Sequence, residues 1–342
     1  MKNVNIRDVA RVAGVSHSTV SRVIRDAYGV SEPMRQRIQA AIDELGYRPR
    51  VAARAMRGST YTIGLVVPSL ASPFFMDLYA GVEDVLAQTT YRPIITVAGL
   101  EEERDQSASA QSLIDRQVDA LIVVAPLVSA DWLSRVGRTL PVAVVGRHDV
   151  SDAYDTVNGD DVHGTRLLME HLTALGHRRI AHLTQFETHE PQVPGTPHLV
   201  RRETYVEFMR SSERAGYTHL ISGAYNEDAA YAAVRDLLDR ALPVPSAIFA
   251  GADDAAFGVL KALAQARLDD EVAVVGYDNT RLSAHPRMSL TSVDQSGQEL
   301  GRRATSLVLE RLAGRTDART EVITPQLIVR SSSHPALRSP AP

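Results

Sequence analysis

The sequence contains no cysteine, and this absence excludes disulfide bonds and cysteine-ligated zinc. Lysine occurs only as Lys2 and Lys261, so Schiff-base chemistry is disfavoured. No Gly-x-Gly triplet is present, which removes the fingerprint of dinucleotide binding. No apolar run approaches the length of a membrane span, and Met1 to Arg25 lack the continuous apolar core of a signal peptide. We therefore expect a soluble, cytoplasmic protein without a membrane partner.

Sequence motifs of common enzymes are missing as well. The stretch Gly159–Gly164 has the glycine spacing of a phosphate-binding loop, but Thr165 stands where that loop needs lysine. Neither Gly-x-Ser-x-Gly nor His-Glu-x-x-His occurs. Asp253 and Asp254 could in principle form a catalytic acid pair, although hydrogen bonding to a hydroxylated ligand is the favoured role. Several histidines are spaced so that no two share a helical face, and we favour loop and core positions over a metal site for His177, His182, His189 and His198. We expect no catalytic residue, metal or cofactor.

Charge is distributed unevenly along the 342 residues. The net charge is −4, yet the first sixty residues hold eleven Lys and Arg against five Asp and Glu, whereas the remainder holds 26 against 36. A head of charge +6 is therefore joined to a body of charge −10. This asymmetry indicates a module that binds a polyanion, attached to a body that does not. The length allows two or three domains.

Two short helical patterns meet near the N-terminus. Apolar residues recur at helical spacing over Ile6–Ala13 and again over Val20–Ile24. Asn5, with an acidic residue three positions on, is suited to cap the first helix, Gly14 can adopt the positive φ that ends it, and Ser16 can cap the second. Two helices joined by a short turn that contains glycine predict a helix-turn-helix (HTH). Taken alone, the pattern also fits a surface helical hairpin in any soluble protein.

The head continues with a third helix, predicted over Glu32–Leu45 with Ser31 as its cap and Gly46 at its end. Three helices of this length form a small core that is marginal alone. The next stretch, Val51–Arg57, is short and helix-prone, and we interpret it as a hinge.

Beyond the hinge the pattern changes. Apolar runs alternate with amphipathic segments over Ile63–Val145, and the alternation restarts over Val162–Val275. A last helix at Gln298–Leu312 and a pair of strands within Val322–Val329 complete the set. This alternation is typical of βα units and parallel sheets, and two successive units predict two lobes with a cleft between them. In such sheets ligands bind outside the carboxyl ends of the strands.

In this order, an HTH head, a hinge and a two-lobed α/β body resemble the LacI/GalR family of transcription regulators. The resemblance runs from Ile6 to Arg330. It is most specific in D-V-A-x-x-A-G-V-S-x-x-T-V-S-R-V at Asp8–Val23, L-G-Y-x-P at Leu45–Pro49, G-H-R-R-I-A at Gly176–Ala181, V-V-G-Y-D at Val274–Asp278, and L-T-S-V at Leu290–Val293 with its following Gln295. The resemblance implies a three-helix HTH head, a short hinge helix and a two-lobed body with parallel sheets, similar to periplasmic sugar-binding proteins.

The resemblance also implies that the second helix reads double-stranded operator DNA. Hydroxyls suited to phosphate oxygens, which set register without reading sequence, belong to Ser16, Thr19 and Ser21. For Ser21, a solvated helix residue is the open alternative. His17 and Ser18 occupy positions that reach base edges in the major groove, and Arg22 can donate two hydrogen bonds to a guanine.

In this family the hinge forms a helix when docked on DNA, and a leucine wedges into a base step through the minor groove. Here Met56 takes that position; it is apolar and comparable in volume, so it can still wedge, and we expect it to hold the kink less firmly than leucine. Ala53 suits close packing of two hinge helices, and Arg54 points to the groove or the phosphates. Two hinge helices imply a homodimer and a pseudo-palindromic operator.

For the body, the resemblance implies a small-molecule effector, with a sugar favoured, held by Ser69, Phe74, Phe75, Arg147, Asp161, Arg201, Tyr225, Asp253 and Asp278. Carboxylates and arginines of this kind suit bidentate binding of vicinal hydroxyls, and Tyr225 can stack on a sugar ring. Two positions depart from the family pattern, because Asp161 stands where asparagine is usual and Thr204 replaces a glycine. For each effector residue, a surface-loop or salt-bridge role is the alternative.

The expected domains are residues 1–48, the DNA-binding head; 49–60, the hinge; 61–330, the effector-binding and dimerisation body; and 331–342, a disordered tail. Within the body, lobe 1 is expected to hold about 61–160 and 292–320, and lobe 2 about 161–291 and 321–330. The loop 187–200 departs most from the family and could cap the cleft or form an exposed insertion. We predict a repressor with effector-controlled affinity, against two rivals, a solute-binding protein and a sugar-processing enzyme.

Overall fold

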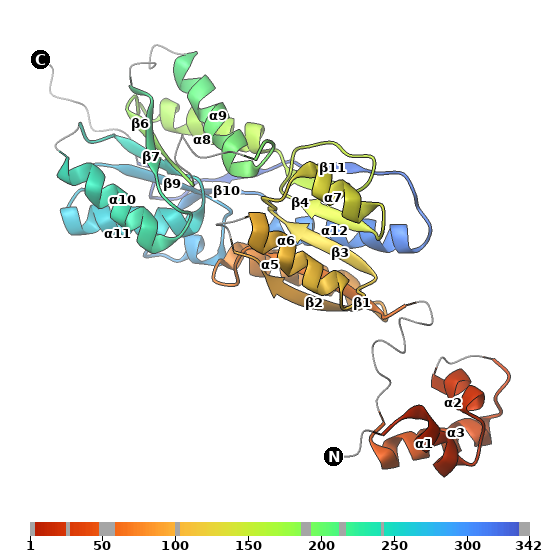
Figure 1. The fold of residues 1–342 in the computed structure, drawn as a ribbon. Coiled ribbons are helices and arrows are strands. Elements are labelled where there is room, and N and C mark those ends of the chain that lie inside the picture. Colours follow the sequence, from red (N-terminus) through yellow and green to blue (C-terminus); the bar gives the residue numbers. More distant parts are fainter. Residues whose placement is uncertain are drawn as a thin grey trace, which may run out of the picture. The chain divides into compact units, whose positions relative to one another are not determined.

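The computed structural model describes residues 4–24, 28–47, 59–99, 103–185, 193–211, 217–240 and 243–334. The chain divides into two compact units, Met1–Thr60 and Tyr61–Pro342, which we call the head and the body and describe one at a time. Figure 1 shows the helices of the head and the two lobes of the body. Within the described ranges, no helix is both long enough and apolar enough to cross a membrane.

Three helices make up the described part of the head: α1 (Ile6–Ala13), α2 (His17–Ile24) and α3 (Glu32–Leu45). Their apolar faces meet in one small core, with Val9, Val20 and Ile38 fully buried at its centre. The predicted HTH head is confirmed, and the predicted bounds of the third helix coincide with those of α3.

Local hydrogen bonds set the ends of these helices. The backbone N–H of Asn5 donates to the carboxylate of Asp8 at 3.0 Å, which confirms the predicted capping box. Gly14 ends α1 with a φ of +62°, in the left-handed region that glycine enters without strain. At the start of α2, Ser16 Oγ accepts from the backbone N–H of Thr19 at 3.2 Å. Ser31 stands at the cap position of α3, but its side chain makes no capping hydrogen bond.

The described part of the body contains two six-stranded sheets. The sheet of lobe 1 has the order β11-β5-β4-β3-β1-β2 and consists of β1 (Thr62–Val67), β2 (Arg92–Val97), β3 (Ala120–Val124), β4 (Val142–Val145), β5 (Asp155–Gly159) and β11 (Thr320–Ile323). The sheet of lobe 2 has the order β12-β10-β9-β8-β6-β7 and consists of β6 (Ile180–Thr184), β7 (His219–Ser222), β8 (Ala247–Ala250), β9 (Ala273–Tyr277), β10 (Thr291–Asp294) and β12 (Gln326–Ile328). Every pair is parallel except β10 with β12, so the predicted two-lobed body with parallel sheets is confirmed.

Helices cover both faces of each sheet. In lobe 1, α5 (Pro73–Leu86) and α12 (Gly297–Leu312) pack on one face, and α6 (Glu103–Ile114) and α7 (Ala130–Gly137) on the other. In lobe 2, α10 (Glu227–Asp239) and α11 (Asp253–Ala266) cover one face, and α8 (Asp161–Ala174) and α9 (Pro197–Arg210) the other. A short 3-10 helix, η2 (Arg281–Ala284), follows β9. Strands buried between two helical layers explain the continuous apolar runs of the sequence, such as β3 and β4.

The chain crosses between the lobes three times, after β5, after β10 and after β11. The predicted lobe bounds are wrong at the last two crossings. Residues from 292 were expected in lobe 1, but Ser292 and Val293 pair with β9 in lobe 2, and Val322 and Ile323, expected in lobe 2, pair with β5 in lobe 1. Each strand satisfies its backbone hydrogen bonds within one sheet, so a crossing falls in the loop after the strand.

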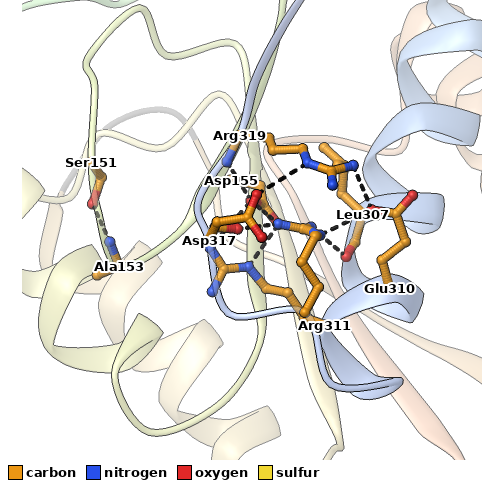
Figure 2. A network of polar contacts seen from close by, with 9 residues as sticks. Ser151, Ala153, Asp155, Leu307, Glu310, Arg311, Asp317 and Arg319 are labelled. Atoms are coloured by element: carbon orange, nitrogen blue, oxygen red, sulfur yellow. Dashed lines mark hydrogen bonds and ion pairs between the residues drawn. The ribbon is translucent and has the colours of Figure 1, made fainter.

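Strand β5 escaped the sequence pattern because polar residues interrupt its apolar run. Asp155 is fully buried in it, and Oδ2 accepts from Arg311 Nε and from Arg315 Nη2, each at 2.7 Å. Its Oδ1 accepts from the backbone N–H of Arg319 at 2.8 Å (Figure 2). Burial raises the pKa of the Asp155 carboxyl, but the hydrogen bonds of Arg315 and Arg311 outweigh burial and the pKa lies below its ordinary value. Asp155 therefore ties the end of α12 to the sheet of lobe 1.

The predicted disordered tail begins too early. Ser332 is bonded to β9 of lobe 2, because its carbonyl oxygen accepts from the backbone N–H of Val274 at 2.9 Å. His171 Nε2 lies 2.8 Å from Ser333 Oγ, and His177 Nε2 lies 2.8 Å from the carbonyl oxygen of His334. Residues 331–334 are thus packed on lobe 2, because backbone groups beyond β12 still find partners there. Residues 335–342 lie outside the described residues.

Candidate functional site

One face of α2 carries the side chains predicted to meet base edges. His17, Ser18 and Arg22 are exposed, whereas Val20 and Val23 of the same helix are buried in the head core. The helical period separates the two sets, so the exposed side chains do not pack in the head core. Its polar and cationic groups have the donors that major-groove base edges accept.

Hydroxyl groups gather at the start of α2. Ser16 Oγ lies 2.7 Å from Ser18 Oγ and 2.8 Å from Thr19 Oγ1. Ser21 differs from these residues in burial, because it is only 6% exposed. The alternative of a solvated Ser21 is wrong, because the residue is buried in the head. Contact of its hydroxyl with a phosphate oxygen stays a prediction. The hinge residues Ala53, Arg54 and Met56 lie outside the described residues.

In the body, the strand ends bring together Arg201 of α9 and Asp161 at the start of α8. Arg201 Nε donates to Asp161 Oδ1 at 2.6 Å, and the two side chains are only 5% and 2% exposed. Arg201 Nη1 donates to the carbonyl of Gly251 at 2.7 Å. Burial raises the pKa of Asp161, but the charge of Arg201 and the contact with His148 outweigh burial and lower it overall. The pair is therefore ionised and fixed.

His148 joins this pair from the other lobe. It follows β4 of lobe 1, and its Nε2 lies 2.7 Å from Asp161 Oδ2. The backbone N–H of His148 also donates to the carbonyl of Gly195, which precedes α9, at 2.8 Å. The described end of the loop 187–200 therefore lies against lobe 1. The sequence placed no role on His148; its position directly after a strand end was the available signal, but its partner lies 13 residues away in the other lobe.

Two tyrosines and a carboxyl group complete the lobe 2 side. The guanidinium carbon of Arg201 lies 3.6 Å from the ring centre of Tyr277, a residue that sequence reasoning missed because it reads as strand core. The Tyr225 hydroxyl is buried against Gly251, where a Cβ would stand 1.8 Å from it. Asp278 accepts from Gln295 Nε2. Burial and the nearby Asp253 raise the pKa of Asp278, while Arg201 opposes the rise.

Two predicted effector residues are already occupied by protein groups. The Asp253 carboxylate is fully buried and accepts from Thr280 N at 2.7 Å, from Ser292 Oγ at 2.6 Å and from Ser283 Oγ. Burial raises its pKa, and these hydrogen bonds oppose the rise. Arg147, 2% exposed, holds Asp149 with two nitrogens and donates to the carbonyls of Pro126 and Val128. Arg147 is thus a salt-bridge partner, which was one alternative stated for it. Asp253 is buried and held by hydroxyl and backbone donors, so it matches neither the surface-loop nor the salt-bridge alternative.

Lobe 1 contributes an aromatic wall. The rings of Phe74 and Phe75 at the start of α5 lie edge to face with centres 5.5 Å apart, and both side chains are partly buried. Phe74 contacts Gly297, where an added Cβ would come within 3.0 Å of the ring. Ser69, at the end of β1, accepts from Ala71 N at 3.0 Å. A hollow of about 700 Å³ lies elsewhere, between α9 and β7, away from these strand ends.

Among the described residues, no group of three or more histidines, aspartates or glutamates could hold a metal ion. His182 lies in the lobe 2 core, where Nδ1 is 3.0 Å from the carbonyl oxygen of Phe249. His198 is buried beside Thr196. His189 lies outside the described residues.

Comparison with known proteins places these two sites in one family. A model of bacterial regulatory proteins of the lacI family matches residues 5–50, and a model of the periplasmic binding protein-like domain matches residues 169–333. The ribose operon repressor of Escherichia coli strain K12 is 31% identical over 338 residues, covering 96% of this chain and 99% of the relative. The chain belongs to the lacI family. It is a DNA-binding transcriptional regulator, which removes the solute-binding rival.

Other relatives agree with this family. The transcriptional repressor PurR of Photobacterium profundum is 29% identical over 342 residues, covering 96% of this chain and 98% of the relative. The structure of the regulator CelR in complex with cellobiose has a TM-score of 0.67 and 29% identity, covering 96% of this chain and 99% of that one. The lac repressor dimer bound to operator and the anti-inducer ONPF has a TM-score of 0.79 over 97% of this lacI-family chain and all of that one; at 24% identity, this likeness shows the fold.

Proposed function

We propose that this lacI-family protein is a repressor that binds a pseudo-palindromic operator as a homodimer, and that a saccharide bound at the strand ends of the body changes its operator affinity. One observation carries the proposal. The same chain has an exposed polar face on α2 and, in the body, a buried Arg201–Asp161 ion pair that His148 of the other lobe contacts. We propose that the protein has no enzymatic activity and uses no cofactor or metal. We also propose that it is located in the cytoplasm, because its operator DNA is there.

The head is proposed to read DNA in two ways. His17, Ser18 and Arg22 meet base edges in the major groove, and Arg22 supplies the most informative contact because its fork matches guanine. Ser16 and Thr19, with the N-terminus of α2 behind them, meet phosphate oxygens.

The hinge, residues 49–60, is proposed to join a DNA-binding domain, residues 1–48, to an effector-binding and dimerisation domain, residues 61–330. When two hinges pair in the minor groove, Ala53 allows close packing, Arg54 meets phosphates or the groove, and Met56 wedges between bases. Support comes from the solved lac repressor, which is described as a dimer bound to operator.

The body is proposed to hold the saccharide between Phe74, Phe75 and Ser69 of lobe 1 and Asp161, Arg201, Tyr225 and Asp278 of lobe 2. Relatives support a sugar, since a lacI-family regulator of Enterococcus faecium has been solved with bound ribose at 25% identity and a TM-score of 0.70, covering 81% of this chain and all of that one. His148 links the lobes through Asp161, so a ligand that prefers the lobes in this arrangement, or in another, acts on the same contact. A ligand that prefers one arrangement must alter DNA binding by the same factor by which DNA alters ligand binding.

The test is binding of the full-length protein to duplexes that tile the region upstream of its own gene, measured by gel shift. One pseudo-palindromic duplex should shift in preference to a scrambled duplex of the same composition. Inserting five base pairs between the half-sites turns one by about half a helical turn and should abolish that preference, because a dimer fixes the spacing. Equal binding to scrambled and palindromic duplexes at low salt contradicts the proposal.

A further inference from the structure

The centre of the proposed effector site holds one guanidinium group, and its charge is already neutralised. Arg201 donates to the Asp161 carboxylate at 2.6 Å and to the Gly251 carbonyl at 2.7 Å. Its planar face lies over the ring of Tyr277 at 3.6 Å. An ion pair this short between two buried side chains is held by a strong attraction, and separating its members leaves a buried charge without a partner.

Other cations near the strand ends are occupied or exposed. Arg147 is held by Asp149 within lobe 1. Arg281 in η2 is exposed to solvent, where water and salt screen its charge. His148 contacts the second oxygen of the same Asp161 carboxylate, so both oxygens of that group are occupied by protein nitrogens.

The charge of Arg202, the next residue of α9, also reaches Tyr225, but its side chain lines the hollow between α9 and β7. The described carboxyl groups that remain around the pair bring no positive charge. Asp278 lies near enough to Arg201 for their charges to interact, and in either protonation state it adds none. Asp160 caps α8 by accepting from His163 N at 2.9 Å. A ligand at this site must therefore supply donors to carboxyl groups instead of acceptors to a free guanidinium.

We infer that the effector is an uncharged or amine-bearing polyol, and that the Arg201–Asp161 pair excludes ligands that carry a phosphate or carboxylate group. This inference rests on the proposed function of the same site. A hydroxyl or ammonium group donates to Asp278 and leaves the ion pair intact. An anion gains nothing from Arg201 unless it displaces Asp161, and it would then stand beside the displaced carboxylate, where like charges repel.

The experiment uses matched sugars and the full-length protein. Calorimetry and thermal shift compare D-glucose with D-glucuronate and glucose 6-phosphate, D-galactose with D-galacturonate, and D-ribose with ribose 5-phosphate. We expect at least one neutral sugar to bind and its anionic counterpart to bind about 100-fold more weakly or not at all. Glucosamine and galactosamine should bind at least as well as their parent sugars.

Asp161→Asn tests the cause, because it keeps the shape of the side chain and removes the charge that neutralises Arg201. The variant should gain about tenfold or more in affinity for the anionic member of the pair. His148→Ala removes only the second partner of Asp161 and should leave the anion excluded. Asp131→Asn, an exposed position on α7, makes the same change in net charge and should behave as the parent protein.

An anionic sugar that binds the parent protein as tightly as its neutral counterpart overturns the inference while leaving the sugar-sensing function intact. Equal anion affinity in Asp161→Asn and the parent protein overturns the role of the ion pair. If no sugar of either charge binds, the proposed saccharide sensing itself fails, and this inference fails with it.

Discussion

The head and the body differ in the range of the contacts that build their sites. In the head, Asn5 and Asp8, or Ser16 and Thr19, lie three residues apart. In the body, Arg201 meets Asp161 across 40 residues, and Arg311 meets Asp155 across 156. In the head, local hydrogen bonds set the helix ends, and the helical period decides which side of α2 is exposed. The body positions its site through buried polar pairs, so a single distant residue can disturb it.

The largest expected effect belongs to the buried pair of Arg311 and Asp155. Asp155→Ala leaves the buried Arg311 without its carboxylate and Arg315 with only Glu310, and it should lower the free energy of unfolding of the body by about 3–5 kcal/mol. Urea unfolding followed by the fluorescence of Trp132, the only tryptophan and one that lies in lobe 1, measures this. Asp317→Ala, at the exposed edge of the same network, is the matched control and should cost little. Equal effects would mean that burial of Asp155 does not matter.

Acid should weaken the body through His182. Burial lowers the pKa of His182 to about 3, against about 6.5 in the unfolded chain. Between these two values the unfolded state binds more protons, so stability falls as the pH drops. From pH 7 to pH 5 this histidine should cost about 2 kcal/mol. The free energy of unfolding is measured at both pH values. His182→Gln should remove the drop of about 2 kcal/mol that His182 causes. His163→Gln, at an exposed position on α8, should not.

In the head, Arg22→Ala should cost about 1–3 kcal/mol of operator binding at the base pair that Arg22 reads, and it should relax base preference there. Binding to a set of operators with each position substituted in turn measures the effect. Arg11→Ala, an exposed arginine of α1, is the matched control and should weaken all operators alike. Uniform weakening by Arg22→Ala would remove Arg22 from the base-reading set.

The smallest effect should come from the corner of the HTH. In Gly14→Ala the added Cβ meets no atom within 4 Å. The stability of the head should therefore fall only by the cost of placing alanine at a φ of +62°, about 1 kcal/mol. Gly14→Asn should cost less, because asparagine tolerates this conformation. Amide hydrogen exchange of α1 and α2 in the intact protein measures both. A loss of several kcal/mol in either variant would show that the corner packs against something.

Local patterns predicted the head almost completely, down to the bounds of α3 and the left-handed Gly14. They also predicted the alternation of strands and helices in the body. They missed β5, because Asp155 and Asn158 are polar and are buried only by virtue of distant partners. Distant partners also explain why sequence reasoning overlooked His148 and did not foresee that protein groups hold Asp253. Arg147 differs, because its ion-pair partner Asp149 is only two residues away.

The account rests on coupling between the two units, and reciprocal binding measures this coupling most directly. The operator Kd is measured with and without a saturating neutral sugar, and the Kd of that sugar is measured with and without operator. The account predicts that both constants change by the same factor. A sugar that binds the body while both constants stay unchanged would contradict it.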